Sequence, residues 1–293
     1  MARLSPDNFL ALDGKQAEYE HARFAVLSVP YDATTSFLTG TRDGPRAIIT
    51  ASQHMEDLDD GLGRESIRAG IATLDPVEPD VSGPDRMHER IFRRAGRVVR
   101  DGKFLIGLGG DHSITSALVR AVHTKHKRLS VLQIDAHADL RDTFQGSPYS
   151  HACVMRRIHD LKIPAVSVGI RSYSSPEARF MRKENKPMFS ARTCRDSDDW
   201  VTRATAALGE DVYVTIDIDA FDPAYAPGTG TPEPGGLDWD QVTDLLASVA
   251  ASRRIVAADV VEVRPLPPSV VTEFLAARLI YRVIGLCTPR ARA

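Results

Sequence analysis

Short apolar segments alternate along the chain with longer segments in which apolar residues recur at helical spacing. Runs rich in Val, Ile, Leu and Phe, bounded by Gly, Pro and Asp, predict strands. Where apolar side chains fall on one face, as at Met87, Ile91 and Ala95, the pattern predicts helices. The strands are expected at 24–29, 67–74, 104–108, 129–135, 165–170, 187–190, 212–217 and 254–263. The helices are expected at 44–55, 84–100, 113–126, 151–161, 176–185, 198–208, 238–252 and 269–286.

The predicted strands are apolar on both faces, which is typical of a parallel sheet covered by helices on both sides. Alternating strands and helices indicate an α/β fold with a mainly parallel sheet. About seven or eight strands fit an open doubly wound sheet and also a closed barrel, and the unequal connections favour the open sheet. No repeat or linker-like run divides the chain, so we expect one domain spanning 1–293.

Composition and charge narrow the classes of function. The 293 residues include 37 Lys and Arg and 39 Asp and Glu, for a net charge of −2. That balance creates no basic field, so we expect neither nucleic acid nor a membrane as a partner. Cys153, Cys194 and Cys287 are too few and too scattered for a disulfide framework. Without a signal peptide or an apolar run of about 20 residues, a cytoplasmic protein is expected.

Four predicted strand ends carry chemically active side chains. They are GLGGDHS (107–113), DAHAD (135–139), DIDAFD (217–222) and Glu262. In an extended segment every second residue shares a face, so Asp135, His137 and Asp139 are expected to converge. Asp217 and Asp219 repeat this spacing. Because parallel strands end at one edge of a sheet, these groups are expected to form one site.

A gathering of carboxylates points to bound cations, because like charges repel unless a cation lies among them. Nitrogen and oxygen donors without thiolate suit Mn²⁺, and less specifically Zn²⁺, Fe²⁺ or Co²⁺. Six donors exceed the needs of one four-coordinate ion and match two ions that share a carboxylate. The candidate metal ligands are His112, Asp135, His137, Asp139, Asp217 and Asp219.

Together these segments resemble the ureohydrolases, the family of arginases, agmatinases and their relatives. The resemblance covers nearly the whole chain. It is carried by VPYDATTSFLTGTRDGPRAI (29–48), LGGDHS (108–113), DAHADL (135–140), YSHA (149–152), DIDAFDPAYAPGTGTPEPGG (217–236) and EVRP (262–265). It implies a three-layer α/β/α sandwich with an eight-stranded, mainly parallel sheet. It also implies two Mn²⁺ per subunit, hydrolysis of a guanidinium group to urea and an amine, and a homo-trimer or homo-hexamer.

The resemblance further implies a role for each residue. One ion would be held by His112, Asp135, Asp139 and Asp217, and the other by Asp135, His137, Asp217 and Asp219. His151 falls on the family's active-site histidine, and Glu262 falls on its guanidinium-binding carboxylate.

The charges of the metal ions and of these side chains suggest a mechanism for hydrolysis of the guanidinium group. Two cations lower the pKa of a bridging water and so generate hydroxide, which Asp139 is expected to orient. Glu262 accepts guanidinium N–H groups, and His151 delivers a proton to the leaving amine. The expected catalytic residues are therefore Asp139, His151 and Glu262.

Three further acids surround this set. Glu233 either joins His151 and Glu262 as a substrate-binding residue, by recognising the cationic tail of the substrate, or is a solvated loop acid. Asp222 is expected to accept hydrogen bonds from the Pro-Gly turn that follows it or from a ligand histidine. Asp111 is expected to do likewise or to cap the helix after it.

The sequence determines least about which guanidine compound is the substrate. The loop at 140–150 does not match that of arginases, whereas YSHA and PGTGTPEPGG resemble agmatinases, which predicts hydrolysis of agmatine to putrescine and urea. N1-aminopropylagmatine, guanidinobutyrate, guanidinopropionate and arginine are alternatives, followed by a metal-dependent deacetylase and an inactive scaffold. Arg141, Phe144, Tyr149 and the loop at 171–176 are expected to line the pocket for the substrate tail.

Overall fold

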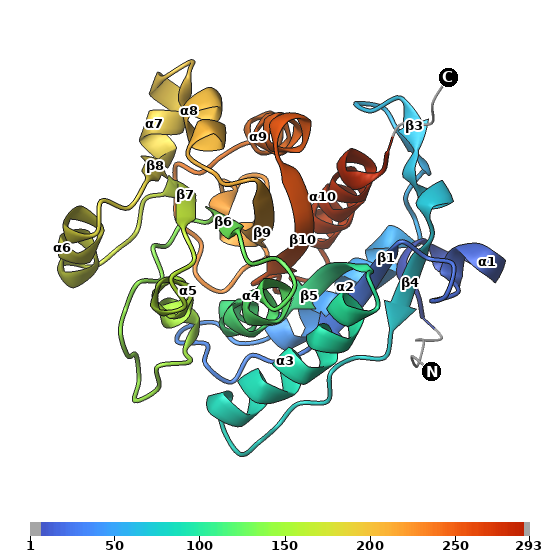
Figure 1. Cartoon of the computed structure of the whole chain (residues 1–293), viewed down its shortest axis with the longest axis horizontal. Helices are drawn as coiled ribbons and strands as arrows, with labels where there is room; N and C mark the ends of the chain where they lie inside the picture. Colours follow the sequence, from blue (N-terminus) through green and yellow to red (C-terminus); the bar gives the residue numbers. More distant parts are fainter. Residues whose placement is uncertain (1–6, 290–293) are drawn as a thin grey trace.

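An open, eight-stranded parallel sheet runs through the centre of the molecule (Figure 1). The computed structural model describes residues 7–289. The strands lie in the order β4-β1-β5-β10-β9-β6-β7-β8, and β4 and β8 form its two edges. Separate edges exclude the closed barrel that the strand count alone allowed. The strands are β1 (Phe24–Val29), β4 (Ile71–Leu74), β5 (Phe104–Gly109), β6 (Leu129–Ile134), β7 (Ala165–Ile170), β8 (Met188–Ser190), β9 (Asp211–Asp217) and β10 (Arg254–Val261).

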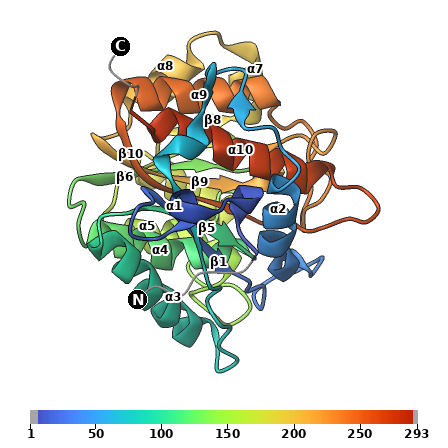
Figure 2. The same ribbon diagram turned by 90° about the vertical axis from the view of Figure 1, so that its right-hand side faces the viewer.

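Helices cover both faces of the sheet and complete the three-layer α/β/α sandwich. In Figure 2, α9 and α10 lie on one side of the sheet, and α3, α4 and α5 lie on the other. Two clusters of buried apolar side chains, one for each face, form the core between the layers. The helices are α1 (Gly14–Ala17), α2 (Gly44–Ser52), α3 (Pro84–Arg100), α4 (Thr115–His123), α5 (Val154–Asp160), α6 (Ser175–Lys183), α7 (Ala191–Asp196), α8 (Trp200–Ala206), α9 (Trp239–Ser252) and α10 (Val271–Cys287).

Most elements form where the apolar pattern predicts them, and the differences have local causes. The strand expected at 67–74 begins only at Ile71, because Ser66–Ala69 is a 3₁₀ turn that ends at Gly70 with a φ of 73°. The helix expected at 44–55 ends at Ser52. The short hairpin of β2 (Leu58–Asp59) and β3 (Arg64–Glu65), and helix α7, were not predicted, because segments this short show no periodicity.

Helix α9 is capped at its start by Asp238, as the sequence predicts. The Asp238 carboxylate accepts a hydrogen bond from the backbone N–H of Gln241 at 2.7 Å, and the Gln241 side chain accepts one in return from the N–H of Asp238. This capping box satisfies two of the free amides that every helix start leaves. Among residues 7–289, no helix combines the length and apolar character needed to cross a membrane.

The strand order explains how distant segments meet. The four strands whose ends carry the candidate residues, β5, β10, β9 and β6, are consecutive neighbours in the middle of the sheet. Since all of these pairs are parallel, their carboxyl ends open on the same edge. The fold therefore gathers His112, Glu262, Asp217 and Asp135 along one short line.

Candidate metal centre and active site

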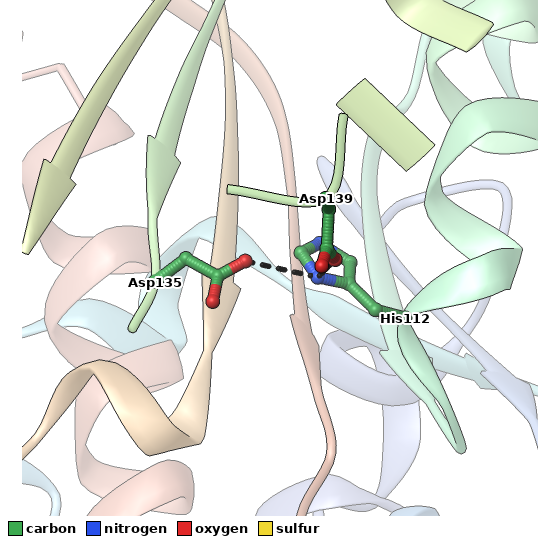
Figure 3. Close-up of side chains that lie close together, drawn as sticks. All are labelled: His112, Asp135 and Asp139. Carbon is green, nitrogen blue, oxygen red and sulfur yellow. Dashed lines mark ion pairs between the residues drawn. The ribbon is translucent and has the colours of Figure 1, made fainter. Parts of the chain in front are cut away.

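A first cluster surrounds His112, which follows β5 in a 3₁₀ turn (His112–Ile114). Its Nδ1 atom lies 3.2 Å from Oδ2 of Asp135 and 3.2 Å from Oδ2 of Asp139. Figure 3 shows the two carboxylates pointing toward the imidazole. Oδ2 of Asp217 lies 3.3 Å away. One imidazole nitrogen thus faces three carboxylates from two strand ends.

A second cluster adjoins the first and shares a residue with it. Nδ1 of His137 lies 2.9 Å from Oδ2 of Asp219 and 3.8 Å from Oδ1 of Asp135. Asp135 is therefore common to the two groups whose donor atoms are close enough to hold an ion, His112–Asp135–Asp139 and Asp135–His137–Asp219. The six predicted ligands converge, and the pair of groups bridged by one carboxylate matches the geometry expected for two cations.

The electrostatics of this cluster favour a bound positive charge. Burial and the neighbouring charge of Asp139 raise the pKa of Asp135 to about 6. Burial opposes protonation of His137, but the charge of Asp219 outweighs it and raises the pKa of the imidazole to about 11. Both shifts express excess negative charge at low dielectric, which protons or metal ions relieve.

Polar side chains beneath the candidate ligands hold them in place. Gln133, fully buried in β6, donates from Nε2 to Oδ2 of Asp135 at 2.8 Å and to the carbonyl of His137 at 3.0 Å. Its own amide oxygen accepts from Ser167 at 2.7 Å. Sequence reasoning missed Gln133, although a lone amide within the apolar strand LSVLQI was a usable signal.

Two of the three predicted catalytic residues occupy a backbone region that L-residues rarely adopt. Asp139 has a φ of 51° and Glu262 a φ of 61°. Such conformations cost about 1–3 kcal/mol and persist where the surroundings impose them. Oε1 of Glu262 accepts a hydrogen bond of 2.7 Å from the backbone N–H of His112. This bond fixes the carboxylate, which is 7% exposed, at the cavity wall.

His151 lies across the cavity on the turn His151–Cys153, and an N-terminal loop holds it. Its Nε2 lies 3.3 Å from the Ser36 hydroxyl, and its backbone N–H donates to Oγ1 of Thr34 at 2.9 Å. Thr34 in turn donates to Asp111, whose other oxygen caps the turn at Ser113. Thr34 and Ser36 were missed because a loop residue gives no sign of its partner.

The cavity above both clusters has a volume of about 310 Å³. Arg141 and Phe144 line it as predicted, and the Arg141 guanidinium lies over the Phe144 ring at 4.7 Å. From the loop at 171–176, the segment 172–174 reaches the wall. The prediction for Tyr149 is wrong, because its ring packs on His88 at 4.7 Å and is not among the lining residues.

Arg171 does not line the cavity but ties together the loops that do. Its guanidinium donates to the carbonyls of Asp219 and Glu233, each at 2.7 Å, and to further carbonyls on the same two segments. Asp222 accepts from the N–H groups of Gly235 at 2.8 Å and Gly236 at 3.0 Å, as expected for the Pro-Gly turn. Oε1 of Glu233 lies 3.8 Å from Nε2 of His137, at the edge of the second cluster.

Comparisons with known proteins agree with this geometry. The model of the arginase family matches residues 22–285. An N(1)-aminopropylagmatine ureohydrolase of Thermus thermophilus is 41% identical over 278 residues, which is 94% of each chain. The N(1)-aminopropylagmatine ureohydrolase of Synechocystis sp. is 38% identical over 275 residues, which cover 91% of this chain and 90% of the Synechocystis protein.

A solved structure has the same fold. The agmatine ureohydrolase of Thermoplasma volcanium superposes with a TM-score of 0.86 at 31% identity, over 97% of this chain and 94% of that one. Family match, full-length similarity and the paired histidine–carboxylate clusters lead to one conclusion. The chain belongs to the arginase family of ureohydrolases.

Proposed function

We propose that this protein hydrolyses N1-aminopropylagmatine to urea and spermidine at a centre of two Mn²⁺ ions. The observation that carries the choice of substrate is full-length similarity, at 38% and 41% identity, to two relatives named for that substrate. The agmatine predicted from the sequence has less support and becomes the second candidate, favoured by the structural likeness to an agmatine ureohydrolase at 31% identity.

The donor set supports the metal centre. Nδ1 of His112 is buried and has no hydrogen-bond partner among residues 7–289, although three carboxylate oxygens lie within 3.3 Å. A nitrogen lone pair aimed at carboxylates fits a cation between them. His112, Asp135, Asp139 and Asp217 would hold one ion, and Asp135, His137, Asp217 and Asp219 the other. Two such ions supply a water of lowered pKa and neutralise the carboxylates.

The other residues act on the guanidinium. Glu262 accepts its N–H groups, because its Oε1 is already fixed by His112 and the buried carboxylate has no competing cation among its described hydrogen bonds. Asp139 lines the cavity and accepts a hydrogen bond from the attacking water. A C–O bond forms to the guanidinium carbon and the C–N bond to the alkyl chain breaks. His151, held by Ser36, delivers the proton with which the amine leaves.

A urea-release assay with Mn²⁺ tests this proposal directly. The panel is N1-aminopropylagmatine, agmatine, 4-guanidinobutanoate, 3-guanidinopropionate and arginine, compared by kcat/KM. We expect the highest value for N1-aminopropylagmatine. A higher value for agmatine would favour the second candidate, whereas a preference for arginine, or no urea from any guanidine, would refute both. Release of acetate from an acetylated polyamine would indicate the deacetylase instead.

Assembly, extent and location remain predictions. The family resemblance implies a homo-trimer or homo-hexamer, and the sequence predicts a single domain spanning 1–293 and a cytoplasmic protein.

A further inference from the structure

A chain of hydrogen bonds runs from the metal cluster into the core beneath His112. Nε2 of His112 lies 2.9 Å from the hydroxyl of Thr215, and that hydroxyl lies 2.6 Å from Oδ1 of Asp259. His112 is 1% exposed, and Thr215 and Asp259 are fully buried. Thr215 on β9 and Asp259 on β10 are direct partners in the strand register. None of the roles assigned above uses either residue.

The direction of these bonds follows from the donors available. Oδ2 of Asp259 accepts from the Tyr213 hydroxyl at 2.6 Å and from the Thr115 hydroxyl at 2.9 Å. The Thr215 hydroxyl donates its single proton to Oδ1 of Asp259, so its oxygen accepts from the imidazole. Nε2 of His112 therefore carries the ring proton. A histidine that binds a metal ion is neutral and has only one N–H, so in that form Nδ1 is left with a lone pair.

This tautomer is the one that a metal site requires. Nδ1, and not Nε2, faces the carboxylates of Asp135, Asp139 and Asp217. In metalloproteins, the second nitrogen of a ligand histidine commonly donates to a carboxylate or another acceptor, which fixes the ring. Here a threonine hydroxyl relays the contact to a carboxylate that lies too deep to reach the ring itself.

We propose that Thr215 and Asp259 are positioning residues of the metal centre, which hold His112 in the Nε2–H tautomer and aim its Nδ1 atom at the ion. This inference rests on the metal centre of the proposed function. It separates two threonines that otherwise look alike: Thr115 and Thr215 both donate to Asp259 from fully buried positions, but only Thr215 touches His112.

That pair supplies a matched control. Thr215→Val removes the hydroxyl at nearly constant shape, Thr215→Ser keeps it, and Thr115→Val removes the other hydroxyl on Asp259. Each holoenzyme is loaded with Mn²⁺ and dialysed against buffers of decreasing free Mn²⁺. The metal retained per chain is then counted by mass spectrometry. Electron paramagnetic resonance distinguishes coupled ion pairs from single ions, and thermal unfolding reports the structural cost of each change.

We expect Thr215→Val to need about 10–100-fold more free Mn²⁺ than the wild type to retain two ions per chain. At Mn²⁺ concentrations where the wild type still holds two ions, the variant should show the electron paramagnetic resonance signal of a single ion. Thr215→Ser and Thr115→Val should retain metal as the wild type does, although Thr115→Val loses a comparable amount of thermal stability. Thr215→Ala provides the same comparison if Thr215→Val does not fold.

Two results would overturn the inference. One is metal retention by Thr215→Val equal to that of the wild type. The other is an equal loss of metal from Thr115→Val, which would reduce Asp259 to a stabilising core residue. A wild-type enzyme that never retains two ions would instead refute the binuclear centre of the proposed function, so the two failures are distinguishable.

Discussion

Glu262 and the backbone of His112 are joined by a hydrogen bond of 2.7 Å, from the N–H of His112 to Oε1 of Glu262. The bond ties the end of β10 to the turn after β5. One contact therefore holds both Glu262, the carboxylate proposed to bind the substrate, and His112, a candidate metal ligand. Burial and repulsion from Asp111 raise the pKa of Glu262 well above its usual range. A guanidinium that binds there would restore the charged form.

Glu262→Gln should abolish most activity without removing metal. The amide oxygen can still accept from His112, but the charge opposite the guanidinium is lost, and loss of one partner of a buried charged pair costs about 2–5 kcal/mol. We expect kcat/KM to fall by about 30-fold or more. Glu210→Gln, which changes an exposed acid just before the start of β9, at the opposite end of that strand from the cavity, is the matched control. A change of only a few-fold in Glu262→Gln would contradict the assignment.

Asp135→Asn should cost more metal than loss of either histidine. Asp135 is the residue shared by both clusters, whereas His112 and His137 each belong to one. We expect the Asp135 variant to retain close to no Mn²⁺ after dialysis, and His112→Ala and His137→Ala to retain one ion each. The metal content per chain measures this. Equal losses in all three variants would argue against a shared carboxylate.

Removing metal should destabilise the fold. The buried carboxylates repel one another without cations, and an ion that binds only the folded chain stabilises it by about 2.7 kcal/mol at a hundredfold excess over its Kd. We expect a chelator to lower the Tm and added Mn²⁺ to restore it. A Tm that does not respond to either would show that the cluster binds no cation in the native protein.

Arg171→Met should loosen the loops at 219–221 and 233–236 more than it harms the core. The guanidinium donates to carbonyls on both loops, and a thioether offers no donor to replace it. We expect faster amide hydrogen exchange in these two segments and a rise in KM larger than the fall in kcat. Arg182→Met, an exposed change on α6, should leave both measurements unaltered. Unchanged exchange in Arg171→Met would refute a positioning role.

His88 should make the fold sensitive to acid. Burial, helped by the charge of Arg120, lowers the pKa of His88 to about 4. Above pH 6.5 neither state is protonated there. As the pH falls from 6.5 to 4, the unfolded chain binds a proton that the folded chain does not, so about 3 kcal/mol of stability is lost.

The comparison that isolates this effect is His88→Gln. The variant should show a flatter dependence of unfolding free energy on pH over that interval, measured by urea denaturation. Parallel curves for variant and wild type would mean that other groups cause the acid sensitivity.

The sequence was sufficient for much of the architecture, and for a physical reason. Strands such as Phe24–Val29 and Leu129–Ile134 are buried along their whole length, so an unbroken apolar run identifies them. Asp238 predicts the start of α9, because the residue that it caps, Gln241, is only three positions away in the sequence. By contrast, the hairpin of β2 and β3 and the turn at Ser66–Ala69 depend on contacts that no local pattern records.

The candidate metal ligands were also accessible to sequence reasoning, because Asp135, His137 and Asp139 are spaced to share one face of an extended segment. The supporting residues were not. Gln133 and Thr215 are polar positions inside apolar strands, which marks them as unusual but does not name their partners. Tyr149 was misplaced because its loop turns the ring towards α3 instead of the cavity.

The sequence by itself predicted a metal site, since the spacing and type of its candidate ligands are local properties, and the family resemblance implied that Glu262 binds the guanidinium. Only the tertiary structure decided that β5, β10, β9 and β6 lie side by side, and hence that their ends form one site. It also decided which nitrogen of His112 faces the carboxylates, because that depends on Thr215 and Asp259 from two other strands. Strand order and hydrogen-bond direction arise from the packing of distant segments, which no single stretch of the chain encodes.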